Sequence, residues 1–148
     1  MSDLQSRIQS ILSTHQLSSL ATITPNSEPW VRYVMAAGAP DMRIRCASLA
    51  GARKVAQIRA NPLVHLTCGV TDPAAMAPYL QVQGRAVFSV DSGERHSFWY
   101  PMLQQVFKGP DDPNYGVIII TPYCIEYCVP GVMQPEVWEA SVTDPSTS

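Results

Sequence analysis

The first apolar residues of the chain recur at the spacing of one helix face. They follow a possible cap at Ser2 or Asp3, so the pattern predicts an amphipathic helix over residues 3–15. Its apolar positions are Leu4, Ile8, Ile11 and Leu12.

A period of two replaces this spacing in the segments that follow, which indicates strands over residues 17–24, 30–36 and 42–47. Proline, asparagine and serine at residues 25–27 predict a hairpin turn between the first two strands. Arg32 is expected to share a face with the even-numbered residues of the second strand.

Residues 46–62, with the sequence CASLAGARKVAQIRANP, end a strand and begin a helix. Asn61-Pro62 stops this helix. An apolar stripe on one side of the helix lies opposite cationic and amide side chains. The helix can therefore pack its apolar side on the core and leave its charged side accessible to a ligand or to solvent. The two sets are Ala52, Val55 and Ile58 against Arg53, Lys54 and Gln57.

The pattern predicts two further strands over residues 63–70 and 79–90. Gly84 lies inside the second strand, where it predicts a bend or bulge. The loop between the two strands contains two prolines.

A capping box at residues 91–94 predicts a helix that runs toward Phe107, and Pro101 must interrupt or restart that helix. Residues 116–129 contain two more strand-like runs, divided by Thr121-Pro122.

Six or seven strands thus follow one another in meander-like succession rather than in strict alternation with helices. This arrangement favours a mainly β fold, a small barrel or sandwich, over a doubly wound sheet. We assign residues 1–130 to one domain and residues 131–148 to a polar, proline-punctuated C-terminal tail. Its last several residues are expected to be disordered.

Composition supports a single domain, because 46% of the 148 residues are hydrophobic and 15% are charged. The net charge of −2 argues against a nucleic-acid partner. Charge is unevenly distributed, however: residues 32–59 hold six of the ten cations and one acid, whereas residues 111–148 hold six acids and no cation. One basic region of this kind suits a small anionic ligand.

No signal peptide or membrane-spanning run is evident, so we expect a cytoplasmic protein with no membrane partner. The four cysteines should then be thiols, and their spacing does not suit a zinc site. No Ser-His-Asp set, paired carboxylates or H-E-x-x-H motif indicates hydrolytic chemistry.

Arg53 and Lys54 occupy the first turn of their helix, where the helix dipole disfavours cations. A bound anion would reverse this cost. Backbone N–H groups, the two cations and the hydroxyl of Ser48 together suit a phosphate. The alternative is that both cationic side chains simply reach solvent.

Four motifs in order resemble the pyridoxamine 5′-phosphate oxidase-like flavoproteins, and within them the general stress protein group. They are the RYVM strand at residues 32–35, the SLAGARK block at residues 48–54 with Gln57-Ile58 and Asn61-Pro62 after it, the YLQVQGRA strand at residues 79–86, and the FKGPDDPN loop at residues 107–114.

The resemblance implies a split β-barrel, Greek-key-like with short flanking helices, that forms a homodimer and binds flavin mononucleotide (FMN) between its subunits. Motif matching implies that the flavin phosphate is held by Arg32, Ser48, Arg53 and Lys54. It further implies that the flavin lies along the backbone of Arg32, Tyr33, Val34, Met35, Cys46 and Ala47, and it offers Gln81 as a contact to the ring.

The implied function is that of an FMN-dependent oxidoreductase with a small-molecule electron donor or acceptor, whose substrate and catalytic residues stay unassigned. Vitamin oxidation is not expected, because the R-L-H-D-R element that holds the substrate of the oxidase proper has no counterpart in residues 129–148. The alternatives are a flavin-binding stress or sensor protein without turnover, and the same barrel with a deazaflavin.

Other conspicuous side chains have structural interpretations. His65 is interpreted as a structural strand residue rather than a catalytic one, and Cys124 and Cys128 as buried thiols rather than a redox pair. The aromatic residues 98–100 are interpreted as core or dimer contacts rather than a platform for the flavin. Trp138 either covers the flavin of the partner chain or packs on its own barrel.

Overall fold

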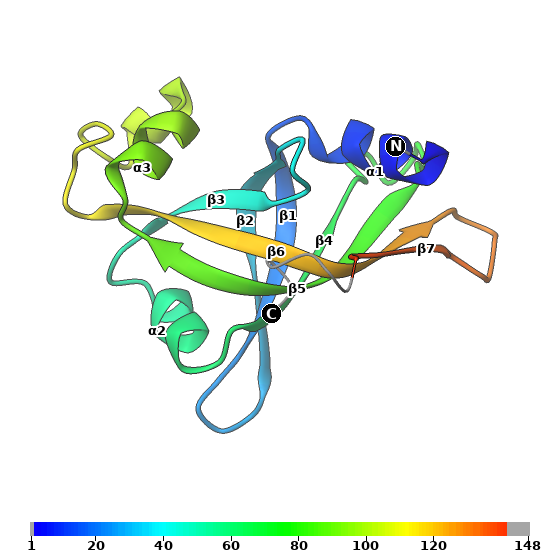
Figure 1. Cartoon of the computed structure of the whole chain (residues 1–148), viewed down its shortest axis with the longest axis horizontal. Helices are drawn as coiled ribbons and strands as arrows, with labels where there is room; N and C mark the ends of the chain where they lie inside the picture. Colours follow the sequence, from blue (N-terminus) through cyan, green and yellow to red (C-terminus); the bar gives the residue numbers. More distant parts are fainter. Residues whose placement is uncertain (1, 142–148) are drawn as a thin grey trace.

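The computed structural model describes residues 2–141, and the predicted disorder at the end of the chain lies outside this range (Figure 1). Strands dominate the described part. In chain order the elements are α1 (Asp3–Leu12), β1 (Gln16–Ile23), β2 (Pro29–Gly38), β3 (Ile44–Leu49), α2 (Arg53–Ala60), β4 (Leu63–Cys68), β5 (Tyr79–Ser89), α3 (Ser92–Phe98), the 3-10 helix η1 (Pro101–Gln105), β6 (Tyr115–Cys128) and β7 (Glu136–Glu139).

All of these strands belong to one antiparallel sheet that closes on itself. Their order is β3-β2-β1-β4-β5-β6-β7, and an additional pairing joins β3 to β6. That pairing encloses six strands in a barrel and leaves β7 as an extra strand beside β6. The predicted mainly β barrel with short flanking helices is confirmed.

β6 has two successive partners along one edge. Its residues 115–120 pair with β3, and its residues 124–127 pair with β7. The prediction of two strands divided by Thr121-Pro122 is wrong, because β5 pairs with both halves and holds them in one strand. The dipeptide instead marks the place where the partner changes, since proline has no N–H to donate to a neighbouring strand.

The core fills the barrel and extends into two helices. Ile8 and Leu12 of α1 and Ile58 of α2 belong to the same buried cluster as Leu20 and other inward residues of the strands. In Figure 1 the two helices lie on opposite sides of the sheet, so each covers a different part of this core. A second cluster around Tyr115 holds α3 and η1 against β3 and β6.

The expected interruption at Pro101 is confirmed. α3 ends at Phe98, and η1 begins at Pro101 with the proline at its first position, where a missing N–H costs nothing. The carboxylate of Asp91 accepts the N–H of Glu94 at 3.0 Å, which supports the capping role read from the sequence.

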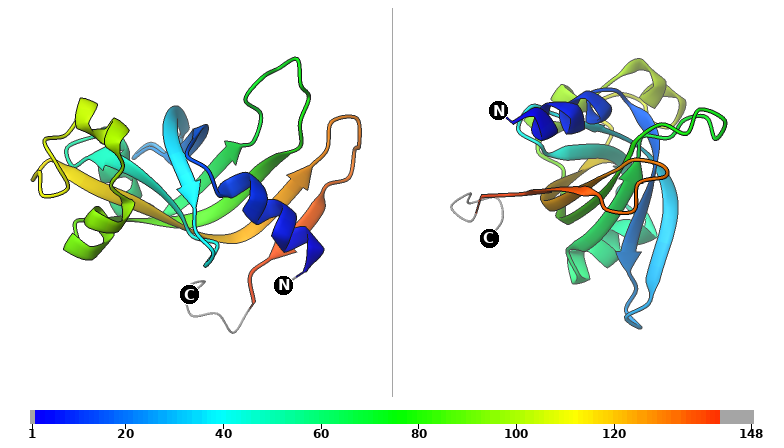
Figure 2. Two further views of the ribbon diagram at one scale, coloured as in Figure 1. Left: turned by 90° about the horizontal axis from the view of Figure 1, so that it is seen from above. Right: turned by 90° about the vertical axis from the view of Figure 1, so that its right-hand side faces the viewer.

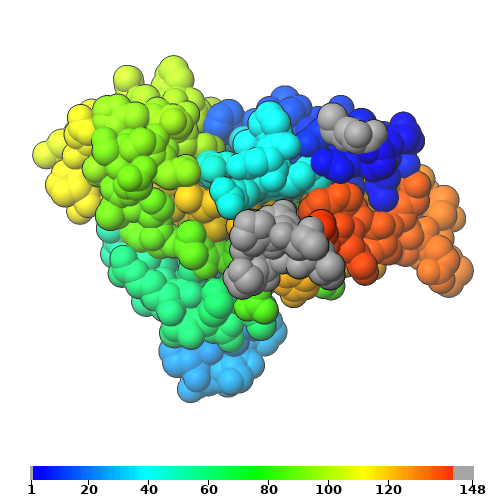
Figure 3. Space-filling model, in the orientation of Figure 1, coloured from blue at the N-terminus to red at the C-terminus, as the bar shows by residue number. Residues whose placement is uncertain are grey.

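Two hairpins project from the barrel. The β1–β2 turn extends below α2 (Figure 3), and the β6–β7 hairpin extends on the side away from α3 (Figures 1 and 2). β7 lies in the segment interpreted as a tail, and Arg7 of α1 fixes it there by two hydrogen bonds to Glu136, at 2.7 and 2.9 Å.

Candidate cofactor site

β2 and β3 pair over a short distance and then separate. Only residues 36–38 of β2 pair with residues 44–46 of β3. Beyond them, residues 29–35 of β2 have a strand partner on one edge alone, and so do residues 47–49 of β3. Each free edge presents backbone N–H and C=O groups that a ligand can use.

A cavity of about 320 Å³ lies beside this separation. Four residues of the predicted site line it, namely Met35, Ala47, Ser48 and Lys54. The opposite wall comes from η1 and its neighbours and is largely apolar, with Tyr100, Met102, Leu103, Val106 and Phe107. The structure therefore places an apolar cavity between the two free strand edges and the start of α2.

α2 begins without a capping side chain. Its N-cap is Ala52, and its first turn contains no acidic residue. α1 and α3, by contrast, are capped by the side chains of Ser2 and Asp91. The first N–H groups of α2 thus add positive potential next to Arg53 and Lys54.

Three cations gather at this helix start without an acidic partner. Among residues 2–141, no carboxylate forms an ion pair with Arg32, Arg53 or Lys54, whereas Arg7 and Arg45 are both paired. Such an arrangement is unfavourable unless an anion joins it.

The pKa shifts show that these cations act on one another. Burial lowers the pKa of Arg32, and the charge of Arg53 lowers it further. Burial also lowers the pKa of Lys54. The charge of Arg32 lowers this pKa further, while the nearby Cys46 partly offsets the shift. A phosphate placed among the three would favour their charged forms.

Arg32 is held in place by neutral acceptors. Its Nη1 donates to the carbonyl oxygens of Leu20 and Trp30, both at 3.1 Å, and to the hydroxyl of Thr22 at 2.9 Å. Its Nη2 donates to Oε1 of Gln57 at 2.9 Å. The guanidinium therefore lies between β1 and α2. This position agrees with the prediction that Arg32 shares a strand face with the even-numbered residues of β2.

Ser48 is buried and lines the cavity, but its hydroxyl donates to the carbonyl oxygen of Leu49 at 3.0 Å. Its oxygen can still accept a hydrogen bond. Ser48 is thus placed beside the cations, with its proton already engaged within the chain.

The remaining predicted residues contribute no side chain to the cavity. Tyr33 is 74% exposed on the outer face of β2, while Val34 and Cys46 point into the core. Burial raises the pKa of the Cys46 thiol to about 12, so this cysteine stays protonated at neutral pH. The motif match gives Tyr33, Val34 and Cys46 a role through their backbone, which requires no side chain in the cavity.

Gln81 is not brought together with the others. It lies on β5 and lines a different hollow, beside the β6–β7 hairpin. There its Oε1 lies 3.7 Å from the thiol of Cys128. The structure gives no contact between Gln81 and the cavity near α2.

Sequence reasoning missed Thr22 and gave Gln57 no role beyond the polar side of its helix. Thr22 is fully buried, and its hydroxyl donates to Oε1 of Gln57 at 2.5 Å. The alternation of residues in β1 could have indicated Thr22. The inward positions of this strand hold the polar residues Gln16, Ser18 and Thr22 together with Leu20. Polar residues at inward positions need buried partners.

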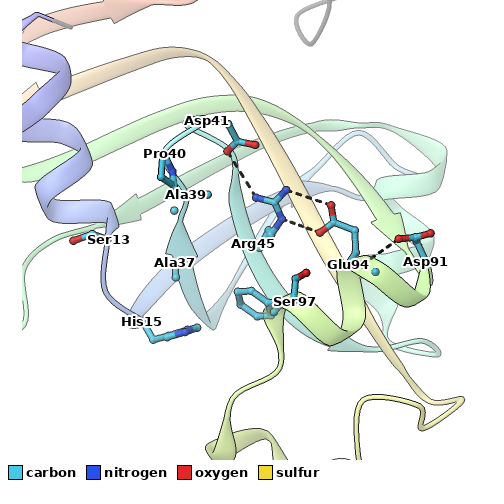
Figure 4. A pocket seen from close by; sticks show the side chains of 13 residues that line it. Ser13, His15, Ala37, Ala39, Pro40, Asp41, Arg45, Asp91, Glu94 and Ser97 are labelled. Carbon is cyan, nitrogen blue, oxygen red and sulfur yellow. Dashed lines mark hydrogen bonds and ion pairs between the residues drawn. The ribbon is translucent and has the colours of Figure 1, made fainter.

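The basic region of the sequence is divided into two places. A larger cavity, of about 730 Å³, lies between α3 and the β2–β3 turn and contains Arg45 (Figure 4). Arg45 is neutralised there, with Nε 2.9 Å from Glu94 and Nη1 3.8 Å from Asp41. Arg43 also lies near Asp41, so the cations of the basic region that form no ion pair within residues 2–141 are those on or beside α2, namely Arg32, Arg53, Lys54 and Arg59.

The other interpreted side chains have mostly structural positions. Phe98 is buried against η1, and Trp138 packs against the core of its own barrel. In residues 2–141 all four cysteines are free thiols, but Cys124 and Cys128 are only half-buried, so their interpretation as buried thiols is wrong. No three His, Cys, Asp or Glu side chains in this range are placed to hold a metal ion. No helix in this range has the length and apolarity to cross a membrane.

Comparisons with known proteins add to this geometry. A family model described as pyridoxamine 5′-phosphate oxidase matches residues 4–128. General stress protein 26 of Bacillus subtilis (strain 168) is 27% identical over 133 residues, which cover 90% of this chain and 94% of that protein.

Solved structures share the fold. General Stress Protein 26 from Bacillus anthracis str. Sterne is 27% identical, with a TM-score of 0.81 over 94% of this chain and 100% of that chain. An F420 reductase is 23% identical, with a TM-score of 0.61 over 79% of this chain and 94% of that one. The second likeness shows the fold alone.

Proposed function

The chain belongs to the pyridoxamine 5′-phosphate oxidase family, and from this premise we propose that it is a flavoprotein that binds FMN. The observation that carries the proposal is the group of three cations at the start of α2 with no carboxylate partner among the described residues. A phosphate monoester supplies the missing negative charge.

The residues around the cavity fit the other parts of the same ligand. The free edges of β2 and β3 offer hydrogen-bonding groups that suit the polar edge of a flavin ring. The apolar wall of η1 suits the hydrocarbon part of such a ring. Arg53, Lys54 and the first N–H groups of α2 suit the phosphate.

We propose further that the bound flavin serves an oxidoreductase reaction with a small-molecule donor or acceptor. The flavin supplies the electron-transfer chemistry, while the protein binds and orients it. Pyridoxamine 5′-phosphate is not the proposed substrate, because residues 129–141 form the β6–β7 hairpin and β7 without the R-L-H-D-R element. The substrate class stays open.

Two alternatives have support of their own. The B. subtilis relative is named a general stress protein, and the missing R-L-H-D-R element favours a flavin-binding protein of that kind without turnover. The shared fold of an F420 reductase favours a deazaflavin in the same cavity. A homodimer and a cytoplasmic location remain predictions that accompany the proposal.

The decisive experiment is to purify the protein and identify what it binds. We expect a yellow protein that releases FMN on denaturation, or an apoprotein that quenches the fluorescence of added FMN. A parallel titration with riboflavin, which lacks the phosphate, measures the contribution of the phosphate to binding. A titration with F420 tests the deazaflavin alternative. Protein that stays colourless and leaves FMN fluorescence unchanged would contradict the proposal.

Turnover is tested separately. The reconstituted protein is mixed anaerobically with NADH or NADPH, and bleaching of the flavin absorbance is followed. Reduction followed by reoxidation with a small acceptor supports an oxidoreductase. Bound flavin that no donor reduces favours the stress or sensor alternative.

A further inference from the structure

The acceptors around Arg32 differ in charge from those around Arg7 and Arg45. Arg7 donates two hydrogen bonds to the carboxylate of Glu136, and Arg45 donates two to the carboxylate of Glu94, at 2.9 and 3.3 Å. Arg32 donates to carbonyl, hydroxyl and amide oxygens only. Its positive charge is therefore fixed in position but not compensated.

Gln57 is the acceptor that joins Arg32 to α2. It lies one helical turn after Arg53, and its Oε1 accepts from Arg32 at 2.9 Å and from Thr22 at 2.5 Å. Thr22 in turn accepts from Arg32 at 2.9 Å. These contacts form a closed triangle of three side chains, so none can turn without breaking bonds to the other two.

We propose that Gln57 is a positioning residue, which holds the guanidinium of Arg32 for a dianionic phosphate monoester and leaves the charge of Arg32 available to that ligand. The inference rests on the proposed function, because it concerns the same phosphate. In this role the neutral side-chain amide of Gln57 allows the site to prefer a ligand with a negatively charged phosphate.

The physical reason is the choice between two acceptors of similar shape. A glutamate at position 57 could bind Arg32 more strongly, as Glu94 binds Arg45. It would also place a negative charge beside Arg53 and Lys54 and compete with the phosphate. Glutamine keeps the geometry and leaves the cluster attractive to an anion.

The test compares Gln57→Glu and Gln57→Leu with the wild type, using FMN and riboflavin as probes and the melting temperature of the cofactor-free protein as a second readout. For Gln57→Glu we expect a higher melting temperature and an FMN Kd raised about tenfold or more, with the riboflavin Kd unchanged. For Gln57→Leu we expect weaker FMN binding together with a lower melting temperature.

Gln83→Glu is the matched control, because it makes the same change of charge at an exposed position on β5. It should leave both dissociation constants unchanged. Wild-type protein that binds no FMN would overturn the proposed function and this inference together. Wild-type binding with a Gln57→Glu variant that binds FMN equally tightly, or that loses FMN and riboflavin affinity in parallel, would overturn the inference alone.

Discussion

Arg53 and Lys54 are adjacent in the sequence but differ in their surroundings. Arg53 is exposed, whereas Lys54 is half-buried and lines the cavity. The sequence could identify both, because two cations in the first turn of a helix contradict the dipole rule. It could not separate Arg45 from them, because the pairing of Arg45 with Glu94 joins residues far apart in the chain.

Replacing Arg53 or Lys54 with alanine should weaken FMN binding by about 1–3 kcal/mol each, the range for losing a hydrogen bond to a charged group. Fluorescence titration measures the effect. Arg59→Ala is the control, since Arg59 lies in the last turn of the same helix, over the ring of Phe88. Equal affinities for all three variants and the wild type would place the phosphate elsewhere.

Asp112 provides a pH-dependent contribution to stability. Its carboxylate accepts the N–H groups of Lys108 at 2.8 Å and Asn114 at 2.9 Å. The Lys108 bond, and then the Asn114 bond, hold the pKa of Asp112 below its ordinary value of 3.8. A folded-state pKa below the unfolded one means that stability is present above about pH 4 and is lost as the pH falls through the lowered value.

Asp112→Asn should therefore lower the melting temperature at pH 7. The difference from the wild type should shrink as the pH falls below about 4 toward the lowered pKa, where the wild-type carboxyl group also becomes neutral. Thermal unfolding at pH 7, 5 and 3 checks this. A difference that is as large at pH 3 as at pH 7 would show that the charge of Asp112 is not the source of the stabilisation.

Among the elements, β5 shows how a single glycine shapes the barrel. The pairing of β5 with β6 shifts between Gln83 and Gly84, which confirms the irregularity predicted at Gly84. A Cβ at position 84 would lie 2.8 Å from Cγ2 of Ile120 and 3.0 Å from the carbonyl oxygen of Thr121. The backbone atom cannot move aside as a side chain can.

Gly84→Ala should consequently destabilise the protein by about 1–3 kcal/mol, the usual cost of overpacking. The loss is measured by urea unfolding. Gly109→Ala is the control, because no atom lies within 4 Å of the Cβ that it would add. Equal stabilities of the two variants would mean that the barrel relaxes at Gly84 without cost.

Element boundaries followed from the sequence where local chemistry sets them. Pro101 starts η1, and Asn61 ends α2, because both effects act within one turn. β7 and the continuity of β6 did not follow, because both depend on a neighbouring strand. The periodicity of a single segment does not show which strand lies beside it.

At the scale of the whole molecule, apolar side chains remain on the outer face of β1 and β2. Leu17, Val31 and Tyr33 are exposed by 59%, 62% and 74%. Their register places Tyr33 opposite Ser19 and Val31 opposite Ala21, so the face has little charge of its own. Such a surface suits burial against a second copy of the chain.

We therefore expect sedimentation velocity to give twice the mass of one chain, and Val31→Asp to shift the protein toward the monomer. Val87→Asp is the matched control, since Val87 is exposed to a similar extent, 59%, on β5. A monomeric wild type, or equal dissociation by both variants, would contradict the assignment of this face.

The pairing of β3 with β6 has a kinetic consequence. It joins a strand from the first third of the chain to one near its end, so it is a non-local contact, which we expect to form late in folding. The pairing holds Ala47 and Ser48 of β3, which line the cavity beside α2, against Val117 and Gly116 of β6. A cofactor bound there should therefore slow the rate at which the barrel opens and leave the rate at which it folds nearly unchanged.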